Sequence, residues 1–253
     1  MTSDGFAYAD ADGVAHIGLG AEVHAMDYIH REVLAGRNIP MAEVHGIVRA
    51  LAVTIRREQG VLLSLLEIRS LDEYTTSHAC NVAMLSMALS DQMGLSDADT
   101  RAIGTAALLH DIGMLRIPAE VLTRPGAITP AERLLIETHT VEGARLLTAR
   151  GLGNSLAATV AYEHHIWFNG TGGYPHLMYP REPHFASRIV HVCDIYDALR
   201  SMRPYHEPWP RDEALALLKS FSGLQLDPQL TDAFLSMADS ATEIRQPFGK
   251  QTA

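Results

Sequence analysis

Thirteen histidines in a chain of 253 residues are the first feature that could carry chemistry. Five of them, with two carboxylates, lie within or at the ends of apolar helical segments. These seven groups are His78, His110, Asp111, His139, His164, His165 and Asp194. Burying this many unpaired imidazoles and carboxylates would carry a large desolvation cost, whereas metal ions use this mixture of nitrogen and oxygen donors. The residues therefore predict a metal site.

The two adjacent pairs are more informative than any single histidine, because a lone histidine on an apolar helix is more often a hydrogen-bonded core residue. His110 stands beside Asp111, a carboxylate able to bridge two ions, and His164 and His165 end a helix before a glycine-rich loop. Both rings of that second pair can turn toward one centre. The mixture suits iron, manganese or zinc better than calcium, and without thiolates it favours a catalytic site over a closed structural zinc site.

Composition narrows the class of protein. Thirty acidic against 20 basic residues give a net charge of -10, which argues against binding to nucleic-acid polymers or anionic membranes. Two cysteines, Cys80 and Cys193, are too few for a disulfide scaffold, so we expect a cytoplasmic protein. No run of about 18 apolar residues and no signal-peptide pattern occurs, so we expect neither secretion nor a membrane span.

Apolar residues recur at helical spacing along most of the chain, and strand-type alternation is nearly absent. We therefore predict an all-α bundle with functional loops at helix ends. Residues 1–25 are expected to form a poorly ordered lead, residues 26–66 a short helical extension, and residues 67–253 the main domain.

Local signals mark two of the helices that carry the predicted ligands. Ser96 is a typical N-cap, and the helix after it is expected to run to Gly113. Thr129 and Glu132 form a capping box with proline at the first helical position, so a helix is expected to begin there and to contain His139.

The order His, His-Asp, His, His-His, Asp resembles the HD-GYP family of metal-dependent phosphodiesterases, within the HD superfamily. The resemblance covers roughly residues 70–235, and the stretches that carry it are DEYTTSH, LLHDIGMLRIP, RPGAITPAE, HHIWFNGTGGYP, SRIVHVCDIYDALRSMRPY and LDPQL. It implies the helical bundle of that family.

The resemblance also implies a reaction and two divalent metal ions, iron or manganese, with zinc and nickel as alternatives. One ion would be held by His78, His110, Asp111 and Asp194, and the other by His139, His164 and His165, with Asp111 bridging. The implied reaction is hydrolysis of cyclic di-GMP, a bacterial second messenger, to linear pGpG by a hydroxide that bridges the metals. Asp111 and His110 are the implied catalytic pair.

Further roles are implied around this centre. Arg203 matches a family arginine that contacts substrate phosphate. Gly170, Gly172 and Tyr174 belong to a loop expected to contact the substrate or a diguanylate cyclase domain, and a tight turn that only positions the histidine pair is the alternative. Asp197 is expected to orient a metal ligand through a hydrogen bond. A homodimer is a further candidate assembly.

Several positions depart from the family pattern. Tyr74 replaces a glutamate that recruits a third metal in some relatives, and Met114 replaces the lysine that follows the His-Asp pair. Ile166 and Asn169 replace acidic residues, and His206 replaces a basic one. Two alternatives therefore stand beside the phosphodiesterase: a catalytically weak, metal-bound module that senses a nucleotide or binds a protein, and a phosphohydrolase of another nucleotide.

Overall fold

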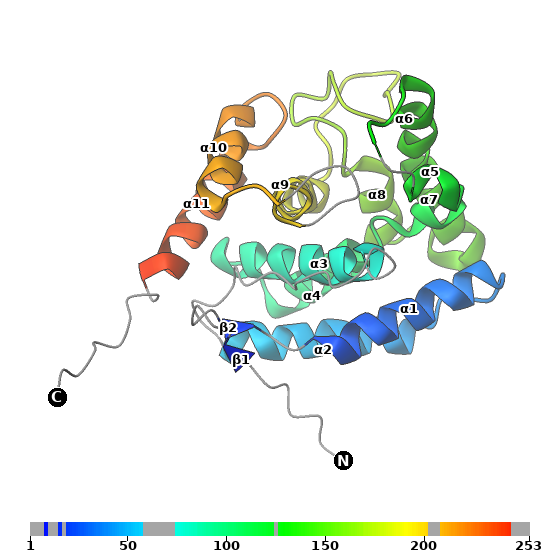
Figure 1. Ribbon diagram of the computed structural model, residues 1–253, viewed down its shortest axis with the longest axis horizontal. Helices are drawn as coiled ribbons and strands as arrows, with labels where there is room; N and C mark the ends of the chain where they lie inside the picture. Colours follow the sequence, from blue (N-terminus) through cyan, green and yellow to red (C-terminus); the bar gives the residue numbers. More distant parts are fainter. Residues whose placement is uncertain are drawn as a thin grey trace, which may run out of the picture.

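A computed structural model shows that the chain folds into a bundle of helices (Figure 1). This confirms the all-α prediction. The structure describes residues 8–9, 15–16, 19–57, 74–123, 126–201 and 208–243. The helical elements are α1 (Gly20–Leu34), α2 (Met41–Arg57), α3 (Tyr74–Gln92), α4 (Asp97–Leu108), η2 (Ile112–Arg116), α5 (Ala119–Leu122), α6 (Pro130–Glu137), α7 (His139–Leu147), η3 (Thr148–Leu152), α8 (Leu156–Glu163), α9 (Phe185–Arg200), α10 (Arg211–Phe221) and α11 (Pro228–Glu243).

Helix α3 is the centre of the bundle. Every residue from Thr76 to Ser90 is buried, because small and apolar side chains occur on all faces of this helix. Helices α4 and α9 pack against it, and α1 and α2 pack on each other along the lower edge of Figure 1. Helices α10 and α11 pack on α9, and α7 and α8 pack together at the other end of the molecule.

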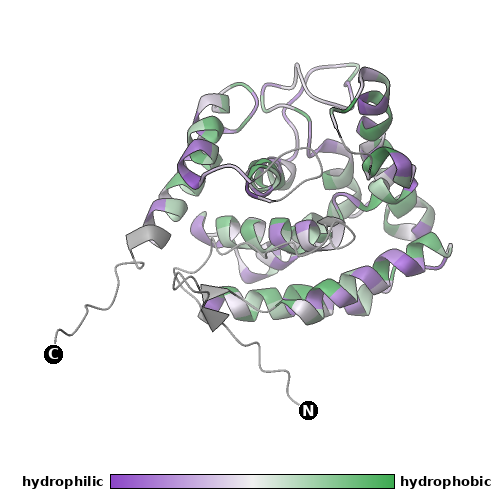
Figure 2. Cartoon of the chain, in the orientation of Figure 1, coloured by the Kyte–Doolittle hydropathy of each residue, from purple (hydrophilic) through white to green (hydrophobic). Residues whose placement is uncertain are grey.

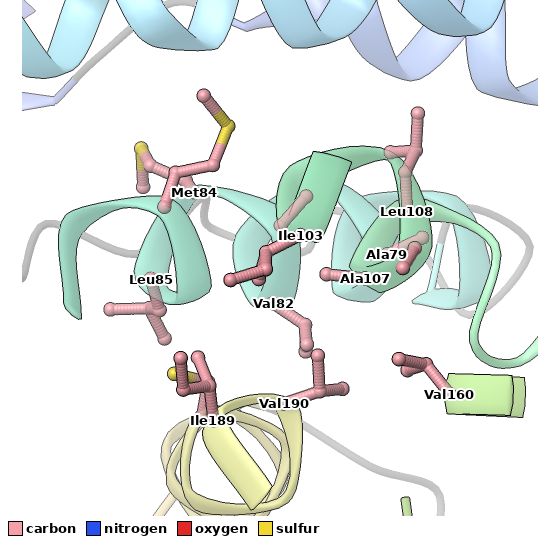
Figure 3. Close-up of a cluster of buried hydrophobic side chains, with 14 of the residues drawn as sticks. Ala79, Val82, Met84, Leu85, Ile103, Ala107, Leu108, Val160, Ile189 and Val190 are labelled. Carbon is pink, nitrogen blue, oxygen red and sulfur yellow. The ribbon is translucent and has the colours of Figure 1, made fainter. Parts of the chain in front are cut away.

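The core joins α3 to its neighbours through aliphatic side chains. Figure 3 shows Val82 and Leu85 of α3 near Ile189 and Val190 of α9, with Ile103 contributed by α4. The outer helices carry both polar and apolar residues along their length, as α1 and α2 show in Figure 2. Burial of these apolar side chains stabilises the bundle by roughly 1.5–3 kcal/mol for each large residue.

The helix capped by Ser96 ends earlier than the sequence suggests. The cap itself is confirmed, since Ser96 Oγ accepts a hydrogen bond from Asp99 N at 3.2 Å. The α-helix stops at Leu108 instead of Gly113, and the chain continues through a turn into the 3-10 helix η2. A Cβ atom at Gly113 would lie 1.9 Å from the carbonyl oxygen of His139, so the chain here touches the backbone of α7.

The capping box of Thr129 and Glu132 is also confirmed, but the helix that follows is interrupted. Helix α6 ends at Glu137 and α7 begins at His139, which is therefore the first residue of a helix and not an interior one. Thr138 N donates to Leu135 O at 3.1 Å, which tightens the last turn of α6 before the chain changes direction.

The N-terminal part contains two strands of two residues each, β1 (Tyr8–Ala9) and β2 (Ala15–His16), paired antiparallel. Helix α1 begins at Gly20, inside the segment 1–25 that was expected to be poorly ordered. The division into three domains otherwise stays a prediction. Among the described residues, no helix combines the length and apolar character needed to cross a membrane.

The close approach at Gly113 generates a test of the fold. A Gly113→Ala substitution pushes a methyl group into backbone atoms of α7, and we expect it to lower the free energy of unfolding by about 2 kcal/mol or more. Gly20→Ala is the control, since nothing lies within 4 Å of a Cβ atom there and the change is expected to stay within about 1 kcal/mol. Chemical denaturation followed by circular dichroism measures the free energy of unfolding of both variants. Equal values for the two variants would contradict the close contact between Gly113 and the backbone of α7.

Candidate metal centre

All seven predicted side chains come together at one end of the bundle. His78 lies in the first turns of α3, His110 and Asp111 lie in the turn after α4, and His139 begins α7. The remaining three come from the end of α8 and the middle of α9, and they are His164, His165 and Asp194. Five separate segments of the fold therefore have to be correctly placed before the cluster exists.

Asp111 lies between two groups of imidazole nitrogens. Its Oδ1 atom is 3.1 Å from His139 Nε2 and 3.5 Å from His164 Nε2. Its Oδ2 atom is 3.5 Å from His110 Nε2 and 3.7 Å from His78 Nε2. Each oxygen of one carboxylate thus faces its own pair of histidines, which is the arrangement of a bridging ligand.

Two sets of donor atoms are compact enough to hold an ion each. His78, His110 and Asp111 form one set, and Asp111 with His139, His164 and His165 forms the other, with the atoms of each set within 4.8 Å of one another. Asp194 stands beside both sets, with Oδ1 3.2 Å from His78 Nε2 and Oδ2 3.7 Å from His165 Nδ1. The division has the form that the resemblance implies, and the role of each residue as a ligand stays a prediction.

Backbone carbonyls orient three of the histidines. In each case Nδ1 donates to a carbonyl oxygen in the last turns of the preceding helix, which leaves the Nε2 lone pair facing Asp111. The pairs are His110 with Ala107 at 2.7 Å, His139 with Ile136 at 2.8 Å, and His164 with Val160 at 3.0 Å.

Asp197 orients the fourth histidine. Its Oδ2 accepts from His78 Nδ1 at 2.6 Å, and its Oδ1 accepts from Asn81 Nδ2 at 2.7 Å and from Ser201 Oγ at 3.1 Å. Asp197 is fully buried, so three donors hold its carboxylate in one position. The structure thus places Asp197 where the sequence analysis expected a residue that orients a metal ligand.

The geometry of the cluster fits metal ions better than a set of hydrogen bonds. His139 Nε2 lies 3.2 Å from His164 Nε2, and both atoms present lone pairs because both Nδ1 atoms donate to carbonyls. Such a contact is repulsive unless a cation lies between the nitrogens, and two nitrogens bound to one ion at about 2.1 Å lie about 3–3.4 Å apart. The buried His110 Nε2 atom likewise has no hydrogen-bond partner among the described residues.

Burial and neighbouring charges set the protonation states. Burial lowers the pKa of His110 to about 4, and burial together with His164 lowers the pKa of His165 well below its ordinary value. Burial tends to raise the pKa of Asp111, but His110 and His139 outweigh it and hold that pKa well below the ordinary range. Burial tends to lower the pKa of His139, but Asp111 outweighs it and raises that pKa. A neutral imidazole, as at His110 and His165, and an ionised carboxylate are the forms in which these groups bind metal.

The glycine loop packs tightly against the histidine pair. The Tyr174 ring lies 4.5 Å from the His165 ring between centroids, and Tyr174 N donates to His165 O at 3.2 Å. A Cβ atom at Gly172 would lie 2.2 Å from the Trp167 ring, and one at Gly170 would lie 2.3 Å from the carbonyl oxygen of Arg181. The glycines therefore allow close packing that supports the histidine pair, and their contact with substrate stays a prediction.

The positions that depart from the family pattern fall in different environments. Ile166 is buried, and Asn169 Oδ1 accepts from Thr171 N at 3.0 Å within the loop. Met114 lines a cavity that also contains Asp111. Arg203 and His206 lie outside the described residues.

Two further histidines near the centre were not singled out by the sequence analysis. His191 is buried with its ring 6.0 Å from that of His165, and burial lowers its pKa to about 4. Its position three residues before Asp194, on the same face of α9, is the signal that could have found it. His30 of α1 lines the same cavity as Asp111, and no local pattern marks it, because α1 is distant in sequence from the cluster.

Comparisons with known proteins show the family of the chain. The HD domain family model matches residues 64–230, more than half of the chain. A cyclic di-GMP phosphodiesterase of Pseudomonas aeruginosa is 35% identical over 205 residues, which are 81% of this chain and 49% of that protein. One from Thermotoga maritima is 37% identical over 195 residues, covering 74% of this chain and 52% of that protein. The chain spans about half the length of these relatives.

Among solved structures, an HDG"Y"P protein from Bdellovibrio bacteriovorus is similar with a TM-score of 0.69, covering 87% of this chain and 70% of that one. The two sequences are 18% identical, so this similarity shows the shared fold.

The hydrogen bond behind His78 generates a first test of the centre. Asp197→Asn keeps the shape of the side chain but weakens its bond to His78 Nδ1, and we expect affinity for Mn²⁺ to fall by about 10–100-fold. Competition with a metal-sensitive dye measures this affinity. Asp227→Asn is the control, because Asp227 is also buried but bonds Arg188 and the backbone at the start of α11. Equal affinities in the wild type and Asp197→Asn would contradict the orienting role.

The two donor sets generate a second test. A double variant with His164→Ala and His165→Ala removes nitrogen donors from one set only, so we expect it to retain about half of the bound metal. Elemental analysis of protein purified with Mn²⁺ gives the stoichiometry. His45→Ala with His176→Ala is the matched control, because both histidines are exposed. Full metal content in the first double variant would exclude the assignment of two ions.

Proposed function

This chain belongs to the HD domain family, in its HD-GYP group, and we propose that it is a metal-dependent phosphodiesterase that opens cyclic di-GMP to linear pGpG. The observation that carries the proposal is the Asp111 carboxylate, whose two oxygens face two separate groups of imidazole nitrogens. The family relationship supports the reaction type, and the names of the relatives support the substrate.

The residues of the cluster would hold two divalent metal ions in such a reaction. His78, His110, Asp111 and Asp194 would hold one divalent ion, and His139, His164 and His165 the other, with Asp111 shared. Two ions held in this way would lower the pKa of a bound water and would offset negative charge on a phosphate oxygen. Asp197 and the helix-end carbonyls keep the imidazoles aimed at the centre, so little reorganisation is needed during the reaction.

The chemistry is hydrolysis of one phosphodiester bond in the ring of the cyclic dinucleotide. Water adds to phosphorus, the bond from phosphorus to the 3′ oxygen breaks, and that oxygen leaves with a proton. Asp111 is ionised, so it can orient the attacking water. Iron or manganese, in preference to zinc or nickel, is the metal we propose from the mixture of nitrogen and oxygen donors.

The finer aspects of the proposal concern location and partners. We place the protein in the cytoplasm, where cyclic dinucleotides are made, on the basis of its two free, buried cysteines. A protein partner such as a diguanylate cyclase domain would meet the loop at Tyr174. The following segment exposes Met178 and Tyr179, which supports a protein contact on that face.

The test is turnover of cyclic di-GMP by Mn²⁺-loaded or anaerobically iron-loaded protein, with products separated by chromatography. We expect pGpG from the wild type and a loss of at least about 100-fold in rate for Asp111→Ala, because that variant removes the shared carboxylate. Asp212→Asn, whose side chain is 92% exposed, is the control and is expected to match the wild type.

Intact cyclic di-GMP in the presence of bound metal would contradict the enzymatic proposal. That result would favour the nucleotide-sensing or protein-binding alternative, in keeping with a methionine at position 114. Faster turnover of another cyclic dinucleotide in a competition assay would instead identify a different substrate.

A further inference from the structure

A cavity of about 220 Å³ lies beside the metal centre, between α1, α3, η2 and α5. Its wall includes Asp111, the carboxylate shared by the two donor sets, so the cavity borders the metal centre. Known pockets that enclose a whole drug-sized ligand measure roughly 300–1,000 Å³. A cavity of this size therefore fits one part of a dinucleotide and not all of it.

The wall of this cavity is mainly apolar. Leu34, Met114 and Ile117 are among the aliphatic side chains that line it. Besides Asp111, the polar side chains among the described lining residues are His30 and Thr75. No lysine or arginine lines the described wall, which makes the cavity unsuited to a second phosphate and suited to a flat, uncharged ring.

His30 reaches the cavity from α1 and is available to bind a ligand. It forms no hydrogen bond or ion pair with the part of the chain that the structure describes. Burial lowers its pKa to about 4, although Asp27 and Asp111 act in the opposite direction. At neutral pH the imidazole is therefore uncharged, with one N–H donor and one nitrogen acceptor to offer.

Helix α1 is held firmly against the catalytic bundle. Met26, Ile29 and Val33 of α1 are buried, and the helix packs on α3 and on η2. At its C-terminal end, Arg150 donates to the carbonyl oxygens of Val33 at 3.4 Å and Arg37 at 3.1 Å. His30 is therefore fixed in place by a helix that lies outside residues 64–230, the part matched by the family model.

We infer that this cavity receives one nucleobase of the substrate and that His30 is a specificity-determining residue, hydrogen-bonding the polar edge of that base. This inference rests on the proposed function for the identity of the substrate. The base would pack between Leu34 of α1 and Met114 of η2, and the Thr75 hydroxyl offers a second hydrogen bond. The N-terminal extension thus supplies part of the substrate site.

The test compares a substrate that has bases with one that has none. The ratio of kcat/KM for cyclic di-GMP to kcat/KM for bis(4-nitrophenyl) phosphate is measured for Mn²⁺-loaded, full-length protein. We expect His30→Ala to lower this ratio about tenfold. The lost hydrogen bond to the base lowers kcat/KM for cyclic di-GMP and leaves kcat/KM for bis(4-nitrophenyl) phosphate unchanged, because that substrate has no base. His24→Ala is the matched control, because His24 is an exposed histidine on the same helix, and its ratio is expected to stay at the wild-type value.

Binding gives a readout that is independent of turnover. Calorimetric titration with GMP, which carries one base and one phosphate, is expected to show a Kd about tenfold higher for His30→Ala than for the wild type or His24→Ala. Leu34→Trp provides a second variant whose folding is not at risk, because Leu34 is 62% exposed. The larger ring fills the cavity, so we expect Leu34→Trp to lower the kcat/KM ratio and to weaken GMP binding, as His30→Ala does.

The two proposals fail in different ways. Wild-type protein that binds GMP in a His30-dependent manner but leaves cyclic di-GMP intact would overturn the phosphodiesterase and keep the base site. Turnover of cyclic di-GMP with an unchanged ratio in His30→Ala and Leu34→Trp would overturn the base site and keep the enzyme. Absence of both turnover and GMP binding would overturn both.

Discussion

The structure depends on placing one carboxylate, Asp111, within reach of four imidazole nitrogens that come from four different segments. An ionised carboxylate that faces four imidazole lone pairs is stabilised by cations between them, and three of these nitrogens come from elements other than the turn that carries Asp111. The turn that carries Asp111 must therefore press against α7. The absence of a side chain at Gly113 permits that contact, with backbone touching backbone.

Backbone carbonyls near the ends of three helices orient three of the histidines in the cluster. Carbonyl oxygens near the ends of helices can accept a second hydrogen bond, and three of them accept the Nδ1 protons of His110, His139 and His164. This interaction selects the imidazole tautomer and leaves Nε2 without a proton. The α-helical hydrogen bonding ends after Leu108 and Glu137, just before His110 and His139.

Helix α1 adds a further wall beside the cluster around Asp111. Helix α1 packs on α3 and η2 through an apolar face, and Arg150 binds the carbonyls at its end. An uncharged histidine and aliphatic side chains consequently line the space beside Asp111. The proposed reaction thus depends on the cluster around Asp111, and the proposed choice of base depends on the wall that α1 contributes.

The sequence by itself determined the helical class, the capping at Ser96 and Thr129, and the seven polar residues that form the cluster, because these signals are local or recur at fixed spacing. Only the tertiary structure decided where the helices stop, that Asp197 bonds His78, and that His30 lies beside Asp111. Contacts between residues as far apart as 78 and 197 depend on how whole helices pack. Side-chain volumes and backbone approach across the core set that packing, and neither has a signature within a short stretch of sequence.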